Sequence, residues 1–471
     1  MFSERDAPII AIATAPGKGA VGVLRISGLG LQNFANALCQ QTLEPRRAHL
    51  ILLKDAHGQV LDQVLALFFP SPHSYTGEDV LELQGHGGPV VLSMLLDRCL
   101  AFAAQEPTHL PGLRRAMPGE FTQRAFLNHK MDLAQAEAVA DLIDAQTQAA
   151  VRGAGRSLAG EFSQQVAHIQ DQLMRLRILV EASLDFPEED IDFVTQANVG
   201  GQLVRITQAL GLLCEKAQQG ALLRDGMKLV IAGQPNAGKS SLLNALTGQE
   251  VAIVTPVAGT TRDVLTQEIA IEGVPVHVVD TAGLRQGESL DEVETIGIAR
   301  AWAQVGDAEV VVLLHDLTRQ QEAAYVQKQN ELTAEVVLRK QANSMVLHVF
   351  NKADLVDQKK HSHTQHENAI FISAKTGEGL QEFKTALLQS VGWQGAHQEG
   401  VFSARARHVQ ALQKVQAHTA QALVCLQESV PALDLLAEEL RCAQQQLSSL
   451  TGTMSADDLL GEIFSSFCIG K

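Results

Sequence analysis

Short apolar runs, separated by glycine and proline, fill residues 1–125 of the chain. Such runs, rich in Ile, Val and Leu, are typical of strands. Two longer amphipathic stretches, at 31–40 and 88–103, have the spacing of helices. Residues 1–127 are therefore predicted to form an α+β domain. Its strands are expected at residues 9–13, 21–26, 64–69 and 80–83.

From residue 128 the sequence changes to Ala, Gln and Leu with few breakers. Leu133, Ala136 and Ala140 recur on one face of a 3.6-residue period, which predicts helices over residues 128–224. Helical spacing returns after residue 390, where leucines between 433 and 447 follow a heptad-compatible pattern.

Residues 225–390 separate these two helical blocks and contain further strand-like runs. The ends of an inserted domain tend to lie close together, so flanking helices can pack with one another. We therefore predict a multidomain fold in which one helical domain, residues 128–224 and 391–471, is interrupted by an α/β domain. The strands of that domain are expected at 228–232, 274–279, 310–314, 345–350 and 370–372.

The chain carries 37 Lys and Arg against 53 Asp and Glu, a net charge of −16. This balance excludes the electrostatic footprint of a protein that holds nucleic acid unaided, so any RNA contact is local or shared with a partner. No run approaches ~18 apolar residues and no signal sequence opens the chain, so we expect a cytoplasmic protein without membrane contact. The six cysteines include no CxxC pair, which favours neither a disulfide framework nor a zinc site.

The strongest chemical signal is GQPNAGKS at 233–240, which follows a strand run and precedes helical spacing. This is the strand, loop and helix context that a P-loop requires. The loop N–H groups wrap phosphate oxygens, Lys239 reaches the β- and γ-phosphates, and Ser240 supplies a hydroxyl to Mg²⁺. The predicted nucleotide contacts are Asn236, Ala237, Gly238, Lys239, Ser240 and Ser241.

Two segments downstream have the composition of nucleotide switches. The polar loop TPVAGTTRD, at 255–263, is suited to ordering around a γ-phosphate and its metal. The strand 274–279 ends at Asp280, which can hold Mg²⁺ through water, and near Gly283, whose N–H can sense the γ-phosphate. Together they predict a Ras-like P-loop GTPase domain. Their expected contacts are Thr255, Pro256, Val257, Ala258, Gly259, Thr260, Thr261, Asp280, Thr281, Ala282 and Gly283.

Two later strands deliver residues that distinguish guanine from adenine. Asp354, in NKAD at 351–354, can accept from guanine N1–H and N2–H. Adenine lacks that donor pair, and an unpaired buried group costs ~1–3 kcal/mol. The Ala374 N–H, at the end of the next strand, is positioned for guanine O6. The predicted base contacts are Asn351, Lys352, Asp354, Ser373, Ala374 and Lys375.

One position departs from the Ras pattern. Leu284 follows Gly283, where Ras-type GTPases carry a glutamine that orients the attacking water. Another group must place that water, and candidates lie among the acids of Asp291-Glu292-Val293-Glu294. The alternative is that these acids only complement the dipole at a helix N-terminus.

Several motifs together resemble the bacterial tRNA-modification GTPases of the MnmE family. They are GQPNAGKS, GTTRD, DTAGL, DEVETIG, NKAD, PGEFTQRAFLN at 118–128, KMDLAQAEAVADLIDA at 130–145 and the final CIGK. The resemblance covers essentially the whole chain. It implies an N-terminal domain that binds a tetrahydrofolate derivative and forms a homodimer, a discontinuous helical domain, and a GTPase domain activated by K⁺-dependent dimerisation.

The same resemblance implies a reaction. With an MnmG-like flavoprotein that carries FAD, in a heterotetramer, these enzymes install a carboxymethylaminomethyl or aminomethyl group at C5 of the wobble uridine of certain tRNAs. Glu294 corresponds to the residue that activates water, and Lys239 to the P-loop lysine. Thr261 joins Ser240 as the implied Mg²⁺ ligand. The implied K⁺ ligands are Asn236, Thr255, Val257 and Thr260.

The resemblance also implies a folate site at Arg25, Glu82, Lys130 and Lys471. Cations suit the glutamyl and formyl oxygens of a folate, and Glu82 can accept from its pterin edge. Without the resemblance, Arg25 and Glu82 would be interpreted as surface residues on edge strands. Cys468 is a candidate nucleophile beside a lysine, or else a hydrophobic residue that packs the tail.

Two other classes of function remain as alternatives. A ribosome-assembly GTPase acts as a binding switch and commonly carries a basic RNA module, whereas the chain after residue 390 is helical and rich in Gln. A membrane-remodelling GTPase would need a basic amphipathic stretch that binds lipid, and none is evident in the sequence.

Overall fold

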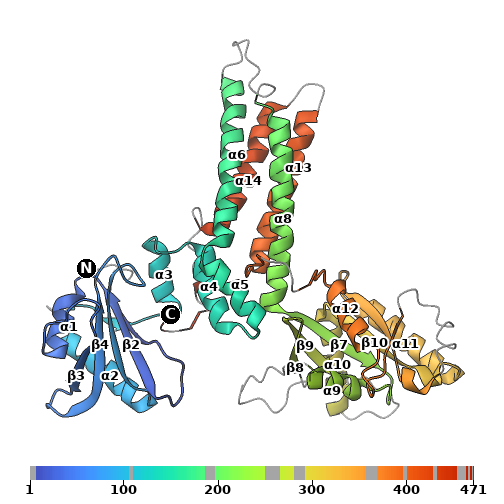
Figure 1. Cartoon of the computed structure of the whole chain (residues 1–471), viewed down its shortest axis with the longest axis horizontal. Coiled ribbons are helices and arrows are strands. Elements are labelled where there is room, and N and C mark those ends of the chain that lie inside the picture. The colour runs from blue at the N-terminus through green and yellow to red at the C-terminus, as the bar shows by residue number, and fades with distance from the viewer. Residues whose placement is uncertain are drawn as a thin grey trace. The chain divides into compact units, whose positions relative to one another are not determined.

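The computed structural model of the chain contains two compact units, Met1–Ala140 with Gln444–Lys471 and Asp141–Ala443 (Figure 1). The structure describes residues 7–105, 110–185, 197–249, 266–280, 292–356, 369–395, 400–427, 432–452, 463–464, 467–468 and 470. Among them, no helix is both long enough and apolar enough to cross a membrane.

The first unit is built on a six-stranded sheet in the order β3-β4-β5-β2-β1-β6. Neighbours run antiparallel except β1 and β6. The strands are β1 (Ile9–Ile12), β2 (Val21–Gly28), β3 (His49–Lys54), β4 (Val60–Phe69), β5 (Asp79–His86) and β6 (Arg114–Arg115). The helices α1 (Leu31–Cys39) and α2 (Pro89–Gln105) contribute Phe34 and Leu95 to one core with Leu24 and Leu83 of the sheet.

Side chains alternate between the two faces of a strand, so the neighbours of these core leucines point away from α1 and α2. Arg25 and Glu82 therefore lie on the second face of the sheet. A small cluster with Ile9 and Phe121 packs there, and Phe121 belongs to α3 (Glu120–Leu127). Since β2 and β5 are central neighbours, the alternative that Arg25 and Glu82 stand on edge strands is wrong.

The second unit contains a six-stranded sheet in the order β12-β11-β10-β7-β9-β8. All its pairs are parallel except β8 with β9. The strands are β7 (Met227–Gly233), β8 (Thr266–Ile271), β9 (Val274–Asp280), β10 (Val310–Asp316), β11 (Met345–Asn351) and β12 (Ile370–Phe371).

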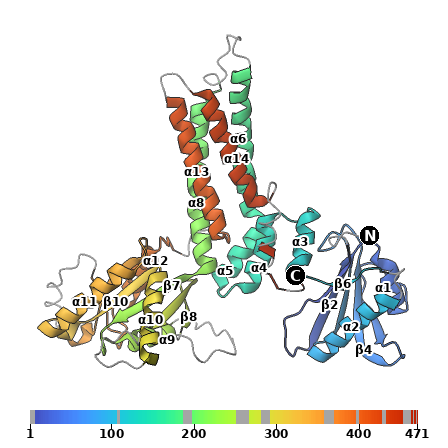
Figure 2. The same cartoon turned by 180° about the vertical axis from the view of Figure 1, so that it is seen from behind.

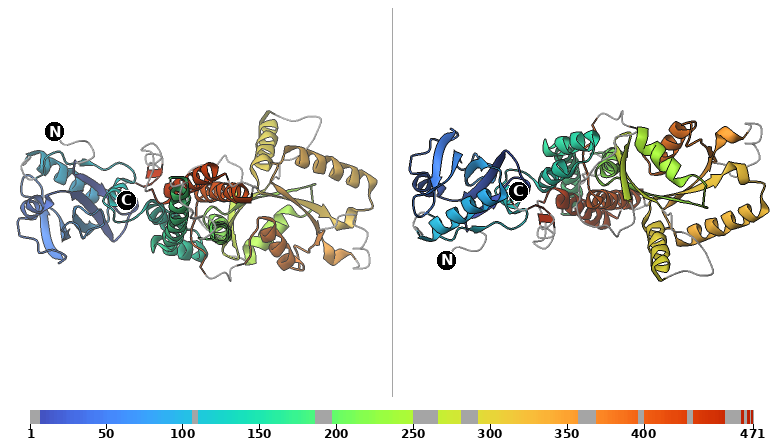
Figure 3. Two further views of the ribbon diagram at one scale, coloured as in Figure 1. Left: turned by 90° about the horizontal axis from the view of Figure 1, so that it is seen from above. Right: turned by 90° about the horizontal axis from the view of Figure 1, so that it is seen from below.

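Helices cover both faces of this sheet (Figure 3). On one face α9 (Lys239–Gln249) and α12 (Leu380–Ser390) pack Leu242 and Phe383 against the strands. On the other face α10 (Glu292–Asp307) and α11 (Ala323–Arg339) contribute Val305 and Val336. The strands buried on both sides read as continuous apolar runs, which is why they were recognisable in the sequence.

Long helices make up the rest of the second unit, and Figures 1 and 2 show α6, α8 and α13 side by side. The helical elements are α4 (Leu133–Asp144), α5 (Gln148–Leu158), α6 (Glu161–Asp185), α8 (Val199–Asp225), α13 (Ala406–Gln427) and α14 (Leu433–Thr451), of which α4 and α14 extend into the first unit. The chain enters the second sheet directly after α8. It returns beside α8 after α12, where the Gln219 amide donates to Gly392 O at 2.7 Å.

Residues 402–403, which precede α13, also contact the helices α5 and α8. The Ser157 hydroxyl of α5 donates to Ser403 O at 2.7 Å, and Gly220 of α8 approaches Phe402 so closely that a Cβ would collide with its carbonyl. The part of the chain from β7 to α12 is called the α/β segment below. Helices that precede it and the chain that follows it in sequence thus pack together.

Candidate functional site

The predicted P-loop connects the end of β7 to the start of α9. Its backbone turns through positive φ at Asn236 (64°) and at Gly238 (96°). A Cβ on Gly238 would collide with the Asn351 side-chain amide, so only glycine fits this crossing. The loop therefore brings its N–H groups together at a helix N-terminus, which is an arrangement suited to phosphate.

The Lys239 ammonium lies inside this loop. It donates to Gly233 O at 2.8 Å and to Gln234 O at 3.3 Å, so a positive charge stands where phosphate oxygens would enter. Ser240 and Ser241 are exposed in the first turn of α9. The Ser240 hydroxyl is a hard oxygen donor of the kind that Mg²⁺ prefers.

Asn351 joins the P-loop to the guanine-reading segment. Its Nδ2 donates to Ala237 O at 2.9 Å, and its Oδ1 accepts from Ala374 N at 3.0 Å. Only 3% of Asn351 is exposed, so its bond to Ala237 is buried, while its bond to Ala374 is partly buried. Two segments that were predicted separately are thereby held by one side chain.

The carboxylate of Asp354 has a defined orientation. Its Oδ1 accepts from the Ser373 hydroxyl at 2.7 Å, and the same hydroxyl accepts from Thr376 N at 3.1 Å. Within the part of the chain that the structure describes, Oδ2 has no recorded partner, and Oδ1 keeps a second lone pair, so two donors of a ligand can be accepted. The arrangement suits a donor pair such as guanine N1–H and N2–H.

Lys352 lies between these residues in sequence, and its ammonium has a partner of its own. Its backbone has φ 67°, and its ammonium lies 2.5 Å from the Asp316 carboxylate. Sequence reasoning did not identify Asp316. The available signal was its position, because it ends a parallel strand and aligns with Asn351 on the neighbouring strand.

Much of the predicted switch lies outside the described residues. Only the strands that lead to it are seen, since β8 begins at Thr266 and β9 ends at Asp280. Glu294 belongs to the first turn of α10, and the side chains of Asp280 and Glu294 are likewise outside the description. Also outside it are Thr255, Pro256, Val257, Ala258, Gly259, Thr260, Thr261, Thr281, Ala282, Gly283, Leu284 and Lys471.

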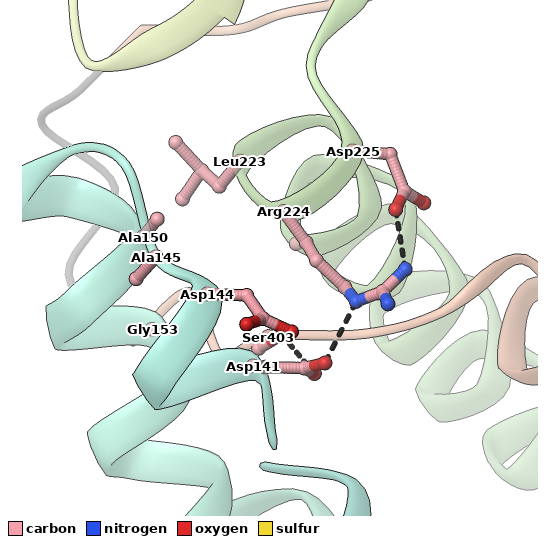
Figure 4. A pocket seen from close by; sticks show the side chains of 10 residues that line it. Asp141, Asp144, Ala145, Ala150, Gly153, Leu223, Arg224, Asp225 and Ser403 are labelled. Carbon is pink, nitrogen blue, oxygen red and sulfur yellow. Dashed lines mark hydrogen bonds and ion pairs between the residues drawn. The ribbon is translucent and has the colours of Figure 1, made fainter. Parts of the chain in front are cut away.

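A small cavity of about 90 Å³ lies between α4, α5, the end of α8 and Ser403 (Figure 4). Asp141 accepts there from Arg224 Nε at 2.7 Å, from Arg405 at 2.8 Å and from the Ser403 hydroxyl at 2.9 Å. Figure 4 shows the Arg224 guanidinium between Asp141 and Asp225. These ion pairs join α4, α8 and the chain before α13, so we interpret the cavity as part of a structural junction.

In the first unit, Arg25 and Glu82 are cross-strand partners. Arg25 Nε donates to Glu82 Oε1 at 2.9 Å, and the guanidinium stands over the rings of Tyr75 and Phe121, 5.3 and 5.8 Å from their centres. The pair places a cation and a carboxylate side by side on one face of the sheet. The Lys130 ammonium donates to Pro72 O at 3.1 Å.

The end of the chain reaches the same unit. Cys468 O accepts from Gly119 N at 3.3 Å, and Gly470 packs against Ile12 of β1, the neighbour of β2. Phe467 is buried, whereas Cys468 is exposed. The thiol therefore does not anchor the tail, contrary to the alternative of a packing role.

Comparison with known proteins adds the family. Residues 8–130 match the profile described as GTP-binding protein TrmE N-terminus, and residues 133–468 match the MnmE helical domain. The tRNA modification GTPase MnmE of Acidovorax sp. (strain JS42) is 58% identical over 472 residues, covering 100% of both chains. The protein of the same name from Polaromonas naphthalenivorans (strain CJ2) is 57% identical over 483 residues, again covering 100% of both.

Proposed function

Because this chain belongs to the MnmE family of tRNA modification GTPases, we propose that its GTP hydrolysis serves a modification at C5 of the wobble uridine of certain tRNAs. The chain is a GTP-hydrolysing enzyme of tRNA modification that uses Mg²⁺. The proposed product carries a carboxymethylaminomethyl or aminomethyl group. The match over the whole chain favours this function over a ribosome-assembly switch.

The observation that supports the proposed GTP site best is the Asn351 bridge. It holds the P-loop and the Ala374 N–H at once, so phosphate and base would meet one preorganised surface. In this proposal Lys239 and the loop N–H groups bind the β- and γ-phosphates, and Asp354 reads the guanine edge. Bound Mg²⁺, held by Ser240 and Thr261, would neutralise charge that develops on the phosphate oxygens.

The attacking water needs a partner other than the side chain of residue 284, because the aliphatic side chain of Leu284 neither donates nor accepts a hydrogen bond. We assign its positioning to Glu294 at the start of α10. The proposed K⁺ ligands Asn236, Thr255, Val257 and Thr260 offer oxygen donors, which suit a hard monovalent cation. Bound there, K⁺ would supply the positive charge that an arginine finger supplies elsewhere.

The cation requirement is directly testable. GTP turnover of the full chain is measured in KCl and in NaCl at equal ionic strength and with excess Mg²⁺. We expect hydrolysis to be strongly faster in K⁺. Equal rates in the two salts would contradict the K⁺ site while leaving the GTP site intact.

The first unit is the proposed folate site. Glu82 offers an acceptor for the pterin edge, and Arg25, Lys130 and Lys471 offer cations for the carboxylates of a tetrahydrofolate derivative. Bound there, the folate would supply the one-carbon unit of the modification. Cys468 is exposed, and its backbone carbonyl accepts from Gly119 N, next to the start of α3. An exposed thiol is accessible to a reactant, which supports a chemical role for it.

The remaining parts of the proposal concern assembly. We propose a cytoplasmic homodimer that works with an MnmG-like flavoprotein carrying FAD. The division into residues 1–127, 128–224, 225–390 and 391–471 stays our working proposal for its domains. The decisive test is mass spectrometry of wobble uridines from cells that lack this protein, with and without a plasmid copy. Unmodified C5 positions that the plasmid copy restores would support the function, and normal modification without the protein would overturn it.

A further inference from the structure

An ion pair beside the predicted guanine pocket was not part of any motif. Asp316 is the last residue of β10 and is 2% exposed. Neighbouring strands β10 and β11 are parallel and align Asp316 with Asn351. The carboxylate therefore emerges at the same edge of the sheet as the guanine-reading residues.

Both oxygens of this carboxylate are engaged. Oδ2 lies 2.5 Å from the Lys352 ammonium. Oδ1 accepts from Thr318 N at 3.0 Å and from the Thr318 hydroxyl at 2.6 Å. The direction of the carboxylate is thereby fixed from the side opposite to the lysine.

The charge on Asp316 is maintained by these partners. Burial raises the pKa of its carboxyl, but the hydrogen bonds from Lys352 and Thr318 outweigh burial and bring the pKa below its usual value. The carboxylate is therefore ionised at neutral pH. It attracts the ammonium as a full charge rather than as a neutral acid.

Lys352 itself is only partly covered, with 30% of its side chain exposed. A free lysine has a flexible four-carbon stem and a strongly hydrated ammonium, so many conformations are lost when it must lie in one place. With the ammonium held by Asp316, the apolar stem of Lys352 remains available to cover the flat face of a base.

The same cluster reaches the phosphate side of the site. Tyr325 of α11 accepts from Asp316 N at 2.8 Å through its hydroxyl. The Tyr325 carbonyl accepts from the side-chain amide of Gln234, in the P-loop, at 2.8 Å. The start of α11 thus connects the P-loop to the strand end that carries Asp316.

We propose that Asp316 is a positioning residue for guanine nucleotides, which acts by holding the Lys352 side chain in place against the base. The proposal rests on the guanine pocket proposed above. The competing explanation is structural, because Asp316 also caps the short 3₁₀ helix Leu317–Arg319 through Thr318.

A double-mutant cycle separates the two explanations. Asp316→Asn keeps an acceptor for Thr318 but removes the charge, and Lys352→Met keeps the stem but removes the ammonium. The dissociation constant of a fluorescent GDP analogue is measured for the full-length wild type, both single variants and the double variant. We expect Asp316→Asn to weaken binding about ten-fold, as for a charged hydrogen bond, and to have no further effect beside Lys352→Met.

Equal weakening by Asp316→Asn in both backgrounds would overturn the proposal in favour of the cap. So would unchanged affinity in the wild-type background. Thr318→Val provides a milder variant should Asp316→Asn fail to fold, because it removes the hydroxyl that orients the carboxylate. We expect a smaller loss of affinity from it, again abolished by Lys352→Met, and a loss that persists beside Lys352→Met would overturn the proposal.

Two further variants complete the design. Glu335→Gln breaks an exposed pair with Arg339 on α11, of 2.9 Å, and is expected to leave the affinity unchanged. A comparable loss from Glu335→Gln would mean that loss of a carboxylate charge lowers affinity even away from Lys352, which would overturn the assignment. Asp354→Asn tests the guanine pocket independently. If Asp354→Asn fails to shift the preference toward xanthine nucleotides, the proposed guanine pocket is wrong. The double-mutant cycle reports only on the coupling of Asp316 to Lys352.

Discussion

Replacing Asn351 by alanine is expected to loosen both halves of the nucleotide site at once. The side chain hydrogen-bonds directly to the P-loop at Ala237 and to the guanine loop at Ala374. Asn351→Ala removes both hydrogen bonds without adding bulk or charge. It leaves the Ala237 carbonyl and the Ala374 N–H without this partner.

The size of the effect follows from the burial of this side chain. Each buried polar group that loses its partner costs ~1–3 kcal/mol, so the two together destabilise the α/β segment by at most about 2–6 kcal/mol. Water that enters the space left by the amide would reduce this figure. A loss of GTP affinity accompanies the destabilisation, because the loops must then be ordered by the nucleotide itself.

A local probe suits this chain better than global unfolding, since a chain with several domains does not unfold in one step. Hydrogen exchange detected by mass spectrometry is followed for peptides that contain the P-loop and residues 373–375. Asn244→Ala is the matched control, because Asn244 is exposed on α9. We expect faster exchange in both peptides and weaker GTP binding for Asn351→Ala, and neither effect for the control.

The result that would refute this reasoning is specific. If exchange increased in one loop but not in the other, Asn351 would serve that loop alone. If both loops exchanged faster while GTP affinity stayed the same, the bridge would contribute to stability but not to the binding site.

The remaining predictions concern chemistry. Asp354→Asn should weaken GTP binding and improve xanthosine triphosphate binding, since it inverts one hydrogen-bond partner; competition titration measures this, and an unchanged preference contradicts the base-reading role. Glu294→Ala should slow GTP hydrolysis strongly at nearly unchanged nucleotide affinity, and a parallel loss of affinity would indicate a structural residue. Burial raises the pKa of Cys99 to about 12, so this thiol should resist iodoacetamide at pH 8 in the native protein, whereas exposed Cys468 reacts. Cys468→Ser should then abolish tRNA modification and leave GTP turnover intact; normal modification by the folded variant would remove the thiol from the mechanism.

The sequence predicted the parallel strands of the second unit well because they are buried on both faces. Every residue of β10 is buried, and such a strand appears as an unbroken apolar run. The P-loop and NKAD follow two of these strands directly, so their place at one edge of the sheet could also be predicted.

The strands β3, β6 and β8 were not predicted. In β3, Leu50 and Leu52 are exposed whereas Ile51 and Leu53 are buried. All four are apolar, so the alternation of polarity that marks a half-buried strand is missing. The short β6 consists of Arg114 and Arg115 and exists only because it pairs with β1. Such pairing depends on contacts that are distant along the chain, which a local pattern cannot contain.

In the candidate site, too, the sequence predicted the residues of local motifs but not the contacts that depend on strand pairing. Asp354 and Lys239 belong to local motifs and could be assigned from the sequence. Asp316 lies outside those motifs, and its contact with Lys352 depends on the alignment of two strands. The pairing of Arg25 with Glu82 likewise depends on strand register, which the sequence did not specify.

The pairing of α8 with α13 has a consequence for how the chain folds. The whole α/β segment separates these two helices in sequence. If that segment were unfolded, pairing the helices would close a very long loop, which is entropically unfavourable. A folded segment already holds its two ends together, as the Gln219 contact with Gly392 indicates. The favourable order during synthesis is therefore α/β segment first and helix pairing second. A substitution that destabilises the α/β segment should consequently delay closure of the helical bundle, even when every bundle residue is unchanged.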